Sequence, residues 1–340
     1  MADRHGIAVA GNWITDKVKI VDAWPAEEHL ANILEEQTGT GGAPYNVGVG
    51  IATLDPGLPL EAIGVVGDDP DGAGILSHLG ALGVGTAGMH TAPGGRTSYT
   101  DVITVRSTGR RTFFHHHGAN ALLGPEHFDF AALRSRILHL GYLMLLDRLD
   151  APDPAQPGRS VGAAVLEKAR AAGLLTSVDI VTDLGPRLST VVKPALAHAD
   201  FFIANELESG AIAGIAARDG GVLLRDALPH IADALLRLGV RRIVVIHAPE
   251  GAYWMGRDGD ALFQPSLKVP QEFIRGTAGA GDAFASGILY GIHEGWDAER
   301  SLQLAVANAA MCLGDPTCTA GLRPLDQALA LIPRFGFRAA

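Results

Sequence analysis

Short apolar segments alternate with amphipathic segments along most of this chain, and this alternation restricts the possible folds more than any other feature. The apolar segments are rich in Val, Ile, Leu and Ala, which is typical of strands buried on both faces. The expected strands are residues 7–11, 62–66, 137–146, 175–180, 201–204 and 242–247. The expected helices are residues 71–82, 161–172, 187–197, 223–238, 281–293, 298–313 and 325–332. The pattern predicts an α/β fold in which a mostly parallel sheet is sandwiched by helices.

Two polar regions interrupt this alternation. Residues 17–22 and 35–40 are extended and polar, and residues 98–106 and 111–116 alternate with period two around a turn signal at 107–110. We expect a small antiparallel β sheet that projects from the core and acts as a lid over a site at the strand ends. The predicted division is an α/β core of residues 1–12, 46–95 and 119–340, and a lid of residues 13–45 and 96–118.

The composition narrows the function classes. The 340 residues are 47% hydrophobic and 19% charged, so the chain can bury a large core. A net charge of −10 without a run of Lys or Arg argues against a nucleic-acid partner, and no apolar run has membrane-spanning length. Cys312 and Cys318 are too few for a disulfide framework or a zinc site of four ligands. These features predict a cytoplasmic protein with no membrane partner.

Residues 276–284, Gly-Thr-Ala-Gly-Ala-Gly-Asp-Ala-Phe, place a carboxylate where a glycine-rich turn enters an amphipathic helix. Glycines let the backbone approach closely, and the first N–H groups of a helix attract negative charge. This is how a protein holds a phosphate beside a base, and Asp282 would be within reach of an attacking hydroxyl. The alternative is a tight turn in which Asp282 only caps the helix.

Two further clusters combine glycines with short polar side chains. The first strand ends in Gly11-Asn12-Trp13-Ile14-Thr15-Asp16, and residues 39–46 read Gly-Thr-Gly-Gly-Ala-Pro-Tyr-Asn before an apolar helix. Short amides and carboxylates on a closely approaching backbone suit a ligand with several hydroxyls, because each hydroxyl both donates and accepts. Turn and cap chemistry explains each cluster taken alone equally well.

A third cluster directly follows the expected strand at 201–204. Asn205 and Glu208 are three residues apart, so both would lie on one face of a helix that begins here. Such a pair can orient the waters of a magnesium ion that bridges nucleotide phosphates. Polar residues also open most helices without any ligand.

Four segments in this order resemble the signatures of the ribokinase family of carbohydrate kinases, also called the phosphofructokinase-B family. They are Gly41-Gly42-Ala43-Pro44-Tyr45-Asn46, the segment 64–72 (Gly-Val-Val-Gly-Asp-Asp-Pro-Asp-Gly), Asn205 to Glu208, and Thr277 to Asp282. The resemblance runs from about residue 7 to about residue 324. It implies a Rossmann-like core with a β lid, the cofactors ATP and magnesium, and phosphorylation of a sugar or nucleoside hydroxyl.

The resemblance also implies roles for single residues. Asp282 would be the general base, and Gly279, Ala280 and Gly281 would form the anion hole with it. The residues expected to bind substrate are Asn12, Asp16, Gly41, Gly42 and Asn46, with Asp147 as an acidic residue near the substrate. The residues expected at the nucleotide are Asn205, His247, Gly251, Thr277 and Asn308, and Asn205 and Glu208 are expected to meet magnesium through water.

Some positions depart from the family pattern. Gly276 stands where the family has an Asp that contributes to a monovalent-cation site, which weakens the expectation of potassium activation. The segment His115-His116-His117 does not predict a metal site, because consecutive strand residues alternate faces. Arg110 and Arg111 fall at the hairpin turn, where we expect solvated charges.

The substrate class remains open at this level. The glycine cluster at 39–46 contains no Lys or Arg, which favours a neutral sugar over a sugar phosphate. A nucleoside kinase is the main alternative, with Trp13, Tyr45, Phe113 and Phe114 as candidate rings for a base. A catalytically weak sugar-binding protein is the second alternative. The lid also predicts a homodimer, because an exposed sheet tends to be covered.

Overall fold

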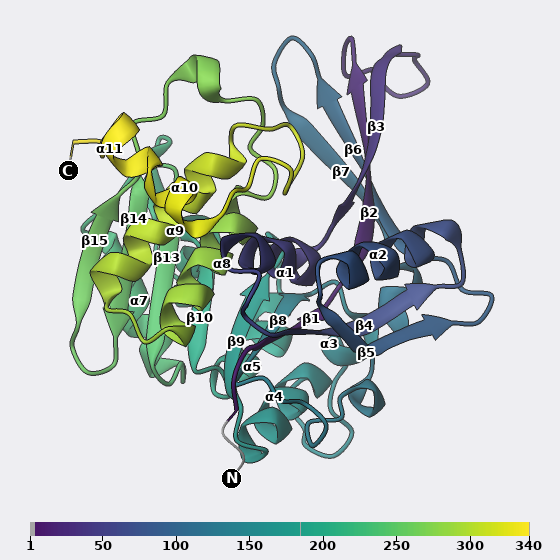
Figure 1. The fold of residues 1–340 in the computed structure, drawn as a ribbon, viewed down its shortest axis with the longest axis vertical. Helices are drawn as coiled ribbons and strands as arrows, with labels where there is room; N and C mark the ends of the chain where they lie inside the picture. Colours follow the sequence, from purple (N-terminus) through teal and green to yellow (C-terminus); the bar gives the residue numbers. More distant parts are fainter. Residues whose placement is uncertain (1–3, 184, 340) are drawn as a thin grey trace.

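The computed structural model describes residues 4–183 and 185–339, which form a large sheet between two layers of helices and a smaller sheet that projects from it (Figure 1). In spatial order the large sheet comprises β15 (Ala261–Pro265), β14 (Gly251–Gly256), β13 (Ile243–Ala248), β10 (Phe201–Asn205), β9 (Leu175–Ile180), β8 (Ile137–Leu143), β1 (Ile7–Gly11), β4 (Leu60–Gly67) and β5 (Gly85–Ala92). Strands β13 to β5 are parallel to one another, and β14 and β15 add an antiparallel edge. The predicted α/β fold with a mostly parallel sheet is confirmed.

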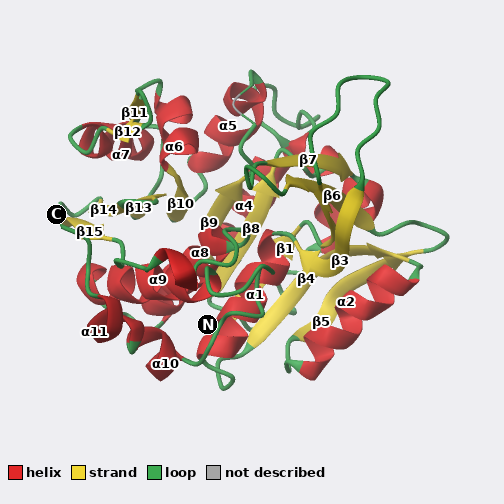
Figure 2. Cartoon of the chain, turned by 90° about the horizontal axis from the view of Figure 1, so that it is seen from above, coloured by secondary structure: helices red, strands yellow, loops and turns green. Residues whose placement is uncertain are grey.

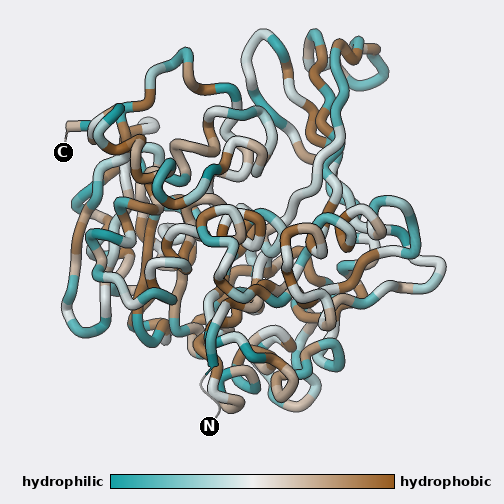
Figure 3. Tube along the Cα trace, in the orientation of Figure 1, coloured by the Kyte–Doolittle hydropathy of each residue, from teal (hydrophilic) through white to brown (hydrophobic). Residues whose placement is uncertain are grey.

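Both faces of the large sheet are buried, as Figure 2 shows from above. Strand β1 illustrates the reason: Ala8 and Ala10 pack into one hydrophobic core, and Ile7 and Val9 pack into the other. The helices over the second core are α1 (Ala43–Leu54), α2 (Pro70–Ala81), α8 (Ala280–His293), α9 (Ala298–Cys312), α10 (Leu325–Leu329) and α11 (Leu331–Phe335). The helices over the first core are α3 (Asp147–Asp150), α4 (Val161–Ala171), α5 (Lys193–Leu196), α6 (Glu206–Ala213) and α7 (Ala227–Arg237). Hydrophobic residues accordingly concentrate along the central strands (Figure 3).

The projecting sheet is built from the strands that we expect to form the lid, and we call it the lid. It contains β3 (Ile33–Gly41), β2 (Ile14–Val21), β6 (Ser98–Val105) and β7 (Arg111–His116), in this spatial order. Two of its pairings are antiparallel as expected, whereas the central pair β2 and β6 is parallel, because each of these strands leaves the core in the same direction. Helix α1 begins at Ala43, so its first residues fall inside the segment 13–45 that we assign to the lid.

The base of the lid is fixed by Asp69. This carboxylate caps α2 by accepting from the N–H of Gly72 at 2.9 Å, and it also accepts from the N–H of Thr97 at 2.7 Å. Thr97 directly precedes β6, so Asp69 joins the start of a core helix to the start of a lid strand. The glycine-rich segment 64–72 therefore has a structural role in this protein.

Some elements differ from the sequence-based expectation. Strands β5, β14 and β15 were not predicted, although the pair Asp258-Gly259 between β14 and β15 is a typical hairpin signal. The expected helix at 187–197 begins as a π-helical turn, η3 (Leu188–Val192), before α5. A short hairpin, β11 (Arg218–Asp219) and β12 (Val222–Leu223), follows α6. Among the described residues no helix combines the length and the apolar character needed to cross a bilayer.

Candidate active site

Polar residues gather at the edge of the large sheet where its parallel strands end. Asn12 follows β1, Tyr142 lies near the end of β8, Asp179 lies near the end of β9, and Asn205 ends β10. Strand β1 continues through Asn12 directly into lid strand β2, so the lid rises above this edge (Figure 1). In open α/β sheets ligands bind at this edge.

Asp282 lies in the first turn of α8 and is buried. Its Oδ2 accepts a hydrogen bond from Nδ2 of Asn46 at 2.8 Å, and its Oδ1 accepts one from the hydroxyl of Tyr142 at 2.6 Å. Burial raises the pKa of Asp282 to about 6, and the two hydrogen bonds oppose this rise. The carboxylate is therefore ionised at neutral pH and close to the pH at which it can accept a proton.

The turn before Asp282 leaves the first N–H groups of α8 available to an anion. Gly279 has φ 75°, and a Cβ at this position would lie 2.6 Å from the carbonyl oxygen of Cys318. The turn thus requires glycine both for its conformation and for space. No side chain in the described part of the chain caps α8, so the first N–H groups of this 14-residue helix have no acceptor, while Gly279, Ala280 and Gly281 are half-buried. The residues present fit a bound phosphate group.

The two glycine clusters meet beside Asp282. A Cβ on Gly41 would lie 2.1 Å from Oδ2 of Asp16, and a Cβ on Gly42, with φ 92°, would lie 2.0 Å from the carbonyl oxygen of Asn12. These glycines let the segment before α1 pass directly over Asn12 and Asp16. Helix α1 also packs against α8, which brings Asn46 to Asp282.

Two amide atoms here are buried without a hydrogen-bond partner among the described residues: Nδ2 of Asn12 and Oδ1 of Asn46. Their orientations are fixed, because Oδ1 of Asn12 accepts from the N–H of Tyr142 at 2.8 Å and Nδ2 of Asn46 donates to Asp282. A buried polar atom without a partner costs stability. One unused donor and one unused acceptor beside a carboxylate match the requirements of a hydroxylated ligand.

Asp16 lies on the face of the lid that is turned toward this site. Burial, together with the charge of Asp282, raises its pKa to about 7. Its Oδ2 lies 4.0 Å from Sγ of Cys318, a residue whose backbone contacts the turn at Gly279. The lid, the glycine turn before α8 and the carboxylates of Asp16 and Asp282 therefore lie in one environment.

Asn205 and Glu208 form a capping box at the start of α6. Oδ1 of Asn205 accepts from the N–H of Glu208 at 2.8 Å, and Oε2 of Glu208 accepts from the N–H of Asn205 at 3.1 Å. The hydroxyl of Thr182 donates to Oε1 of Glu208, and burial raises the pKa of this carboxyl. Across the described ranges no group of three His, Cys, Asp or Glu could hold a metal ion. The pair is engaged in the cap of α6, and each carboxylate oxygen of Glu208 keeps an acceptor position that suits a metal-bound water.

Asp179 lies between the two carboxylate regions and was not predicted from the sequence. It is buried, and burial together with the charges of Glu208 and Asp282 raises its pKa well above the usual range. The raised pKa favours the protonated form of Asp179, which lessens the negative charge between α6 and α8.

The four other residues expected at the nucleotide occupy different places. The ring of His247, at the end of β13, lies 5.0 Å from the ring of Phe284 in α8, and burial lowers its pKa to about 4. Thr277 is exposed before α8, and Gly251 lies in β14 against the backbone of Gln264. Asn308 is fully buried in α9 and donates from Nδ2 to the carbonyl oxygen of Ala283 at 2.8 Å. The structure thus brings His247 to α8, whereas Asn308 ties α9 to α8.

The region of Gly276 is closely packed. A Cβ at this position would lie 2.8 Å from Cα of Pro316. An aspartate side chain would therefore displace the loop that carries Cys318.

The three consecutive histidines do not share one face. The rings of His115 and His117 lie 5.2 Å apart on one side, and His116 lies on the other, as strand geometry predicts. Nδ1 of His115 lies 2.9 Å from the hydroxyl of Thr100, and the ring of His116 stacks on Tyr99. Nδ1 of His117 lies 2.5 Å from Oδ1 of Asp147. Asp147 is exposed, so it contacts the lid and does not join the cluster around Asp282.

Arg111 corrects an expectation. We expected a solvated charge at the hairpin turn, but Arg111 opens β7, is half-buried and shares a lid face with Asp16. Burial raises the pKa of the Cys318 thiol well above its usual range, and the charge of Arg111 opposes this rise. Arg111 therefore places a positive charge near the loop that contacts the glycine turn before α8.

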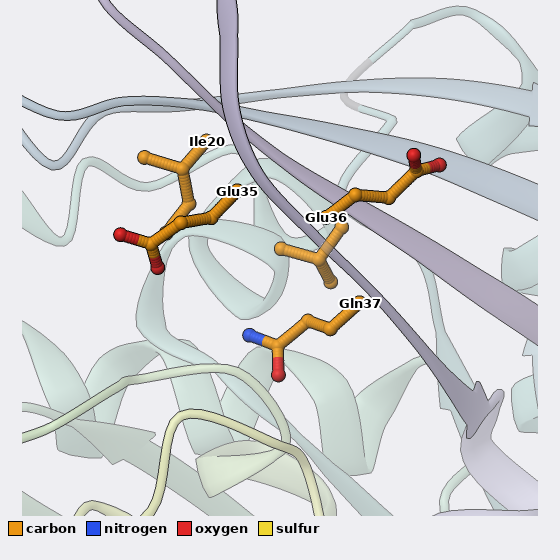
Figure 4. Close-up of a pocket in the computed structure, with 5 residues that line it drawn as sticks. Ile20, Glu35, Glu36 and Gln37 are labelled. Atoms are coloured by element: carbon orange, nitrogen blue, oxygen red, sulfur yellow. The ribbon is translucent and has the colours of Figure 1, made fainter.

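A cavity of about 300 Å³ lies farther out on the lid (Figure 4). It is lined by Val18, Ile20, Glu35, Glu36 and Gln37. Its walls contain carboxylates but no cation, and none of the predicted site residues contributes to it. We therefore place the functional site at the strand ends and not in this cavity.

Sequence reasoning missed Tyr142. This residue contacts Asp282 through its hydroxyl and Asn12 through its N–H. Its position at the end of a buried strand was the available signal, because functional residues gather there in parallel sheets. The partner, however, lies 140 positions away along the chain, and only the fold brings the two residues together.

Known proteins share this architecture. The pfkB family carbohydrate kinase model matches residues 5–324. An ATP-dependent ribose-1-phosphate kinase from Halopiger xanaduensis is 30% identical over 307 residues, which is 89% of this chain and 89% of that protein. The solved structure of Arabidopsis thaliana ribokinase complexed with ribose and ATP superimposes with a TM-score of 0.78 at 20% identity, covering 97% of this chain and 99% of that chain.

A nucleoside kinase from Methanocaldococcus jannaschii, an archaeal member of the ribokinase family, gives a TM-score of 0.75 at 19% identity over 97% of this chain and 99% of that chain. The match of the family model spans almost the whole chain, and the fold is that of the ribokinases. The chain belongs to the pfkB family of carbohydrate kinases, and it is a phosphotransferase with an alcohol group as acceptor.

Proposed function

We propose that this enzyme transfers the γ-phosphoryl group of ATP to a hydroxyl of a small neutral sugar, with Asp282 as general base. The observation that carries the proposal is the junction of a buried, ionised carboxylate with an uncapped helix N-terminus. A hydroxyl that donates to Asp282 would lie next to N–H groups that attract a phosphate.

The chemistry asked of the protein is positioning and charge stabilisation. Asp282 would take the proton of the attacking hydroxyl as the bond to phosphorus forms, and the N–H groups of Ala280, Gly281 and Asp282 would stabilise the charge of the transferred group. The pKa of about 6 keeps Asp282 ionised at neutral pH and predicts loss of turnover as pH falls through 6.

The polar atoms around Asp282 support a sugar as substrate. Nδ2 of Asn12 can donate to a hydroxyl, and Oδ1 of Asn46 can accept from one. Asp16 would approach from the lid, over Gly41 and Gly42. Because these groups already surround the base, a vicinal diol would satisfy all of them at once.

The remaining roles concern the nucleotide. His247 and Thr277 flank the start of α8, and Gly251 follows the turn between β13 and β14. Asn308 would act on the adenine side indirectly, by holding α9 against α8. Magnesium would supply charge neutralisation of the phosphates when bound, with Asn205 and Glu208 meeting it only through water. The packing at Gly276 argues against dependence on potassium.

The test is ADP release from magnesium ATP with a panel of ribose, deoxyribose, fructose, ketodeoxygluconate, ribose 1-phosphate, fructose 1-phosphate, adenosine and inosine. We expect turnover with one neutral sugar and none with Asp282→Asn. Nucleoside turnover would favour the nucleoside kinase, for which Phe113 is an exposed ring on the site face of the lid. If no compound causes ADP release but calorimetry detects sugar binding, a catalytically weak binding protein is favoured.

A sugar phosphate is the second candidate substrate, and Arg111 favours it. This cation shares the lid face of Asp16 and acts on the loop beside Asp282. An acceptor that carries its own phosphate would need such a charge. If ribose 1-phosphate is the best substrate and Arg111→Gln raises its KM but not that of ATP, the neutral-sugar proposal is wrong.

We also propose that two copies associate through their lids in the cytoplasm. Five large apolar lid side chains, Trp24, Leu30, Ile33, Phe113 and Phe114, are more than half exposed, and the ring of Trp24 stacks on Phe114. The free thiols of Cys312 and Cys318 fit a reducing compartment. Light scattering should give the mass of a dimer, and Trp24→Asp should convert it to a monomer.

A further inference from the structure

We propose that Tyr142 is a positioning residue for Asp282, whose hydroxyl fixes the carboxylate in the ionised state and in the orientation needed to meet the sugar. This inference rests on the proposed function, because it assumes that Asp282 is the base. It assigns a role to a residue that lies outside all four sequence signatures.

The geometry of the hydrogen bonds supports this role. The hydroxyl of Tyr142 lies 2.6 Å from Oδ1 of Asp282, and Nδ2 of Asn46 lies 2.8 Å from Oδ2, so each carboxylate oxygen has one donor. Each oxygen of a carboxylate can accept two hydrogen bonds. One acceptor position on each oxygen is thus left for the hydroxyl of a substrate.

Tyr142 also connects the base to the predicted sugar site. Its N–H donates to Oδ1 of Asn12 at 2.8 Å, and the N–H of Asn12 donates to the carbonyl oxygen of Gly141 at 3.1 Å. The same contact leaves Nδ2 of Asn12 buried and without a partner. A single residue of β8 therefore orients both the general base and a donor for the sugar.

Several other titratable groups face Asp282: Asp16 from β2, Asp179 from β9, and Cys312 and Cys318 from α9 and the loop that follows it. Burial raises the pKa of Tyr142, Asp179 and Cys318 well above the usual range and that of Cys312 to about 12. Tyr142 and the two thiols therefore stay protonated near neutral pH, and the shift of Asp179 favours its protonated form. Asp16, with a pKa of about 7, titrates in the same range as Asp282. The two carboxyls form a coupled pair whose apparent pKa values are shared.

The test compares Tyr142→Phe with the wild type in pH profiles of kcat and kcat/KM, using the sugar with the highest turnover. We expect kcat to fall roughly tenfold, because one hydrogen bond to a charged group is lost. The acidic limb of kcat/KM should move up by about one pH unit, because the hydroxyl stabilises the ionised form of Asp282. The KM for ATP should not change.

Tyr290→Phe is the matched control. Tyr290 is a buried tyrosine of the same helix as Asp282, and its hydroxyl donates to a carboxylate, that of Asp55, at 3.4 Å. This variant should keep both the kcat and the pH profile of the wild type. A shared change in the two variants would indicate a general effect of losing a hydroxyl and would overturn the inference.

A second variant covers the case in which Tyr142→Phe does not fold. Site-specific replacement of Tyr142 by 3-fluorotyrosine keeps the shape and makes the hydroxyl a stronger donor, so the acidic limb should move to lower pH. A fall in kcat without movement of this limb, or no change at all, would overturn the inference. The outcome is distinct from failure of the proposed function, because a kcat within about tenfold of the wild type in Asp282→Asn would reject the base itself.

Discussion

Helices α6 and α8 both begin at the ligand edge of the sheet with a conspicuous sequence signature, but their first turns differ. At α6 the polar groups satisfy one another, since Asn205 and Glu208 exchange hydrogen bonds across a capping box. At α8 the cap is Gly279, no described side chain caps the helix, and Asp282 turns toward Tyr142 and Asn46. A polar motif that is satisfied locally stabilises a helix, whereas one that is left open is available to a ligand.

The same contrast holds elsewhere in the core. Asp69, Ser160 and Asp297 cap α2, α4 and α9 with side-chain hydrogen bonds. Helix α1 resembles α8, because its cap is Gly42 with φ 92° and no side chain satisfies its first turn. The two helices without a side-chain cap at this site are the two that meet at Asp282. Their open ends give up stability in exchange for binding capacity.

The largest effect on turnover should follow from a substitution that displaces the turn before α8. Gly279→Ala places a Cβ 2.6 Å from the carbonyl oxygen of Cys318, so the turn must move. We expect turnover to fall about 100-fold, because misplacement of reacting groups by an ångström has effects of this size. Initial-rate measurements with saturating ATP would show it.

Gly214→Ala is the matched control at α6. Gly214 ends that helix with φ 71°, and no atom lies within 4 Å of its Cβ position. The control has the same backbone strain without a collision, so it should lose about 1 kcal/mol of stability and keep its turnover. Equal losses of turnover in the two variants would contradict the proposed difference between α8, whose first turn is open to a ligand, and α6, whose first turn is satisfied locally.

A smaller effect should come from Glu208→Gln. Glutamine can keep the capping box, so the melting temperature should not fall, but the charge that would meet a metal-bound water is lost. We expect the magnesium concentration for half-maximal rate to rise about tenfold, as for other residues that act on a metal indirectly. An unchanged magnesium requirement would indicate that Glu208 has only a structural role in α6.

The smallest effect concerns the stability cost of the open site. The pKa of Asp16 is raised from 3.8 to about 7, so its protonated form stabilises the folded state below pH 4, and this contribution is lost as pH rises through 7. Asp16→Asn cannot ionise, so it should melt a few degrees above the wild type at pH 8 and at the same temperature at pH 4. Calorimetry at the two pH values would test this, and a lower melting temperature at pH 8 would contradict it.

The sequence was sufficient for the fold class, because buried parallel strands and amphipathic helices have distinct periodicities. It also singled out Asp282, the glycines and Asn46, which the structure brings together. It could not reveal Tyr142 or Asp179, because their roles depend on partners from other strands. It also could not predict that Arg111 faces the site, since this depends on the register of β7 against β6.

The central claim is that Asp282 is the base of a sugar kinase, and Asp282→Asn tests it most directly. Asparagine has nearly the same shape, so the variant should fold and bind ATP as the wild type does. We expect its kcat on the preferred sugar to fall by about 1000-fold or more, within the range that general base catalysis supplies. A kcat within about tenfold of the wild type, measured on a correctly folded variant, would contradict the account.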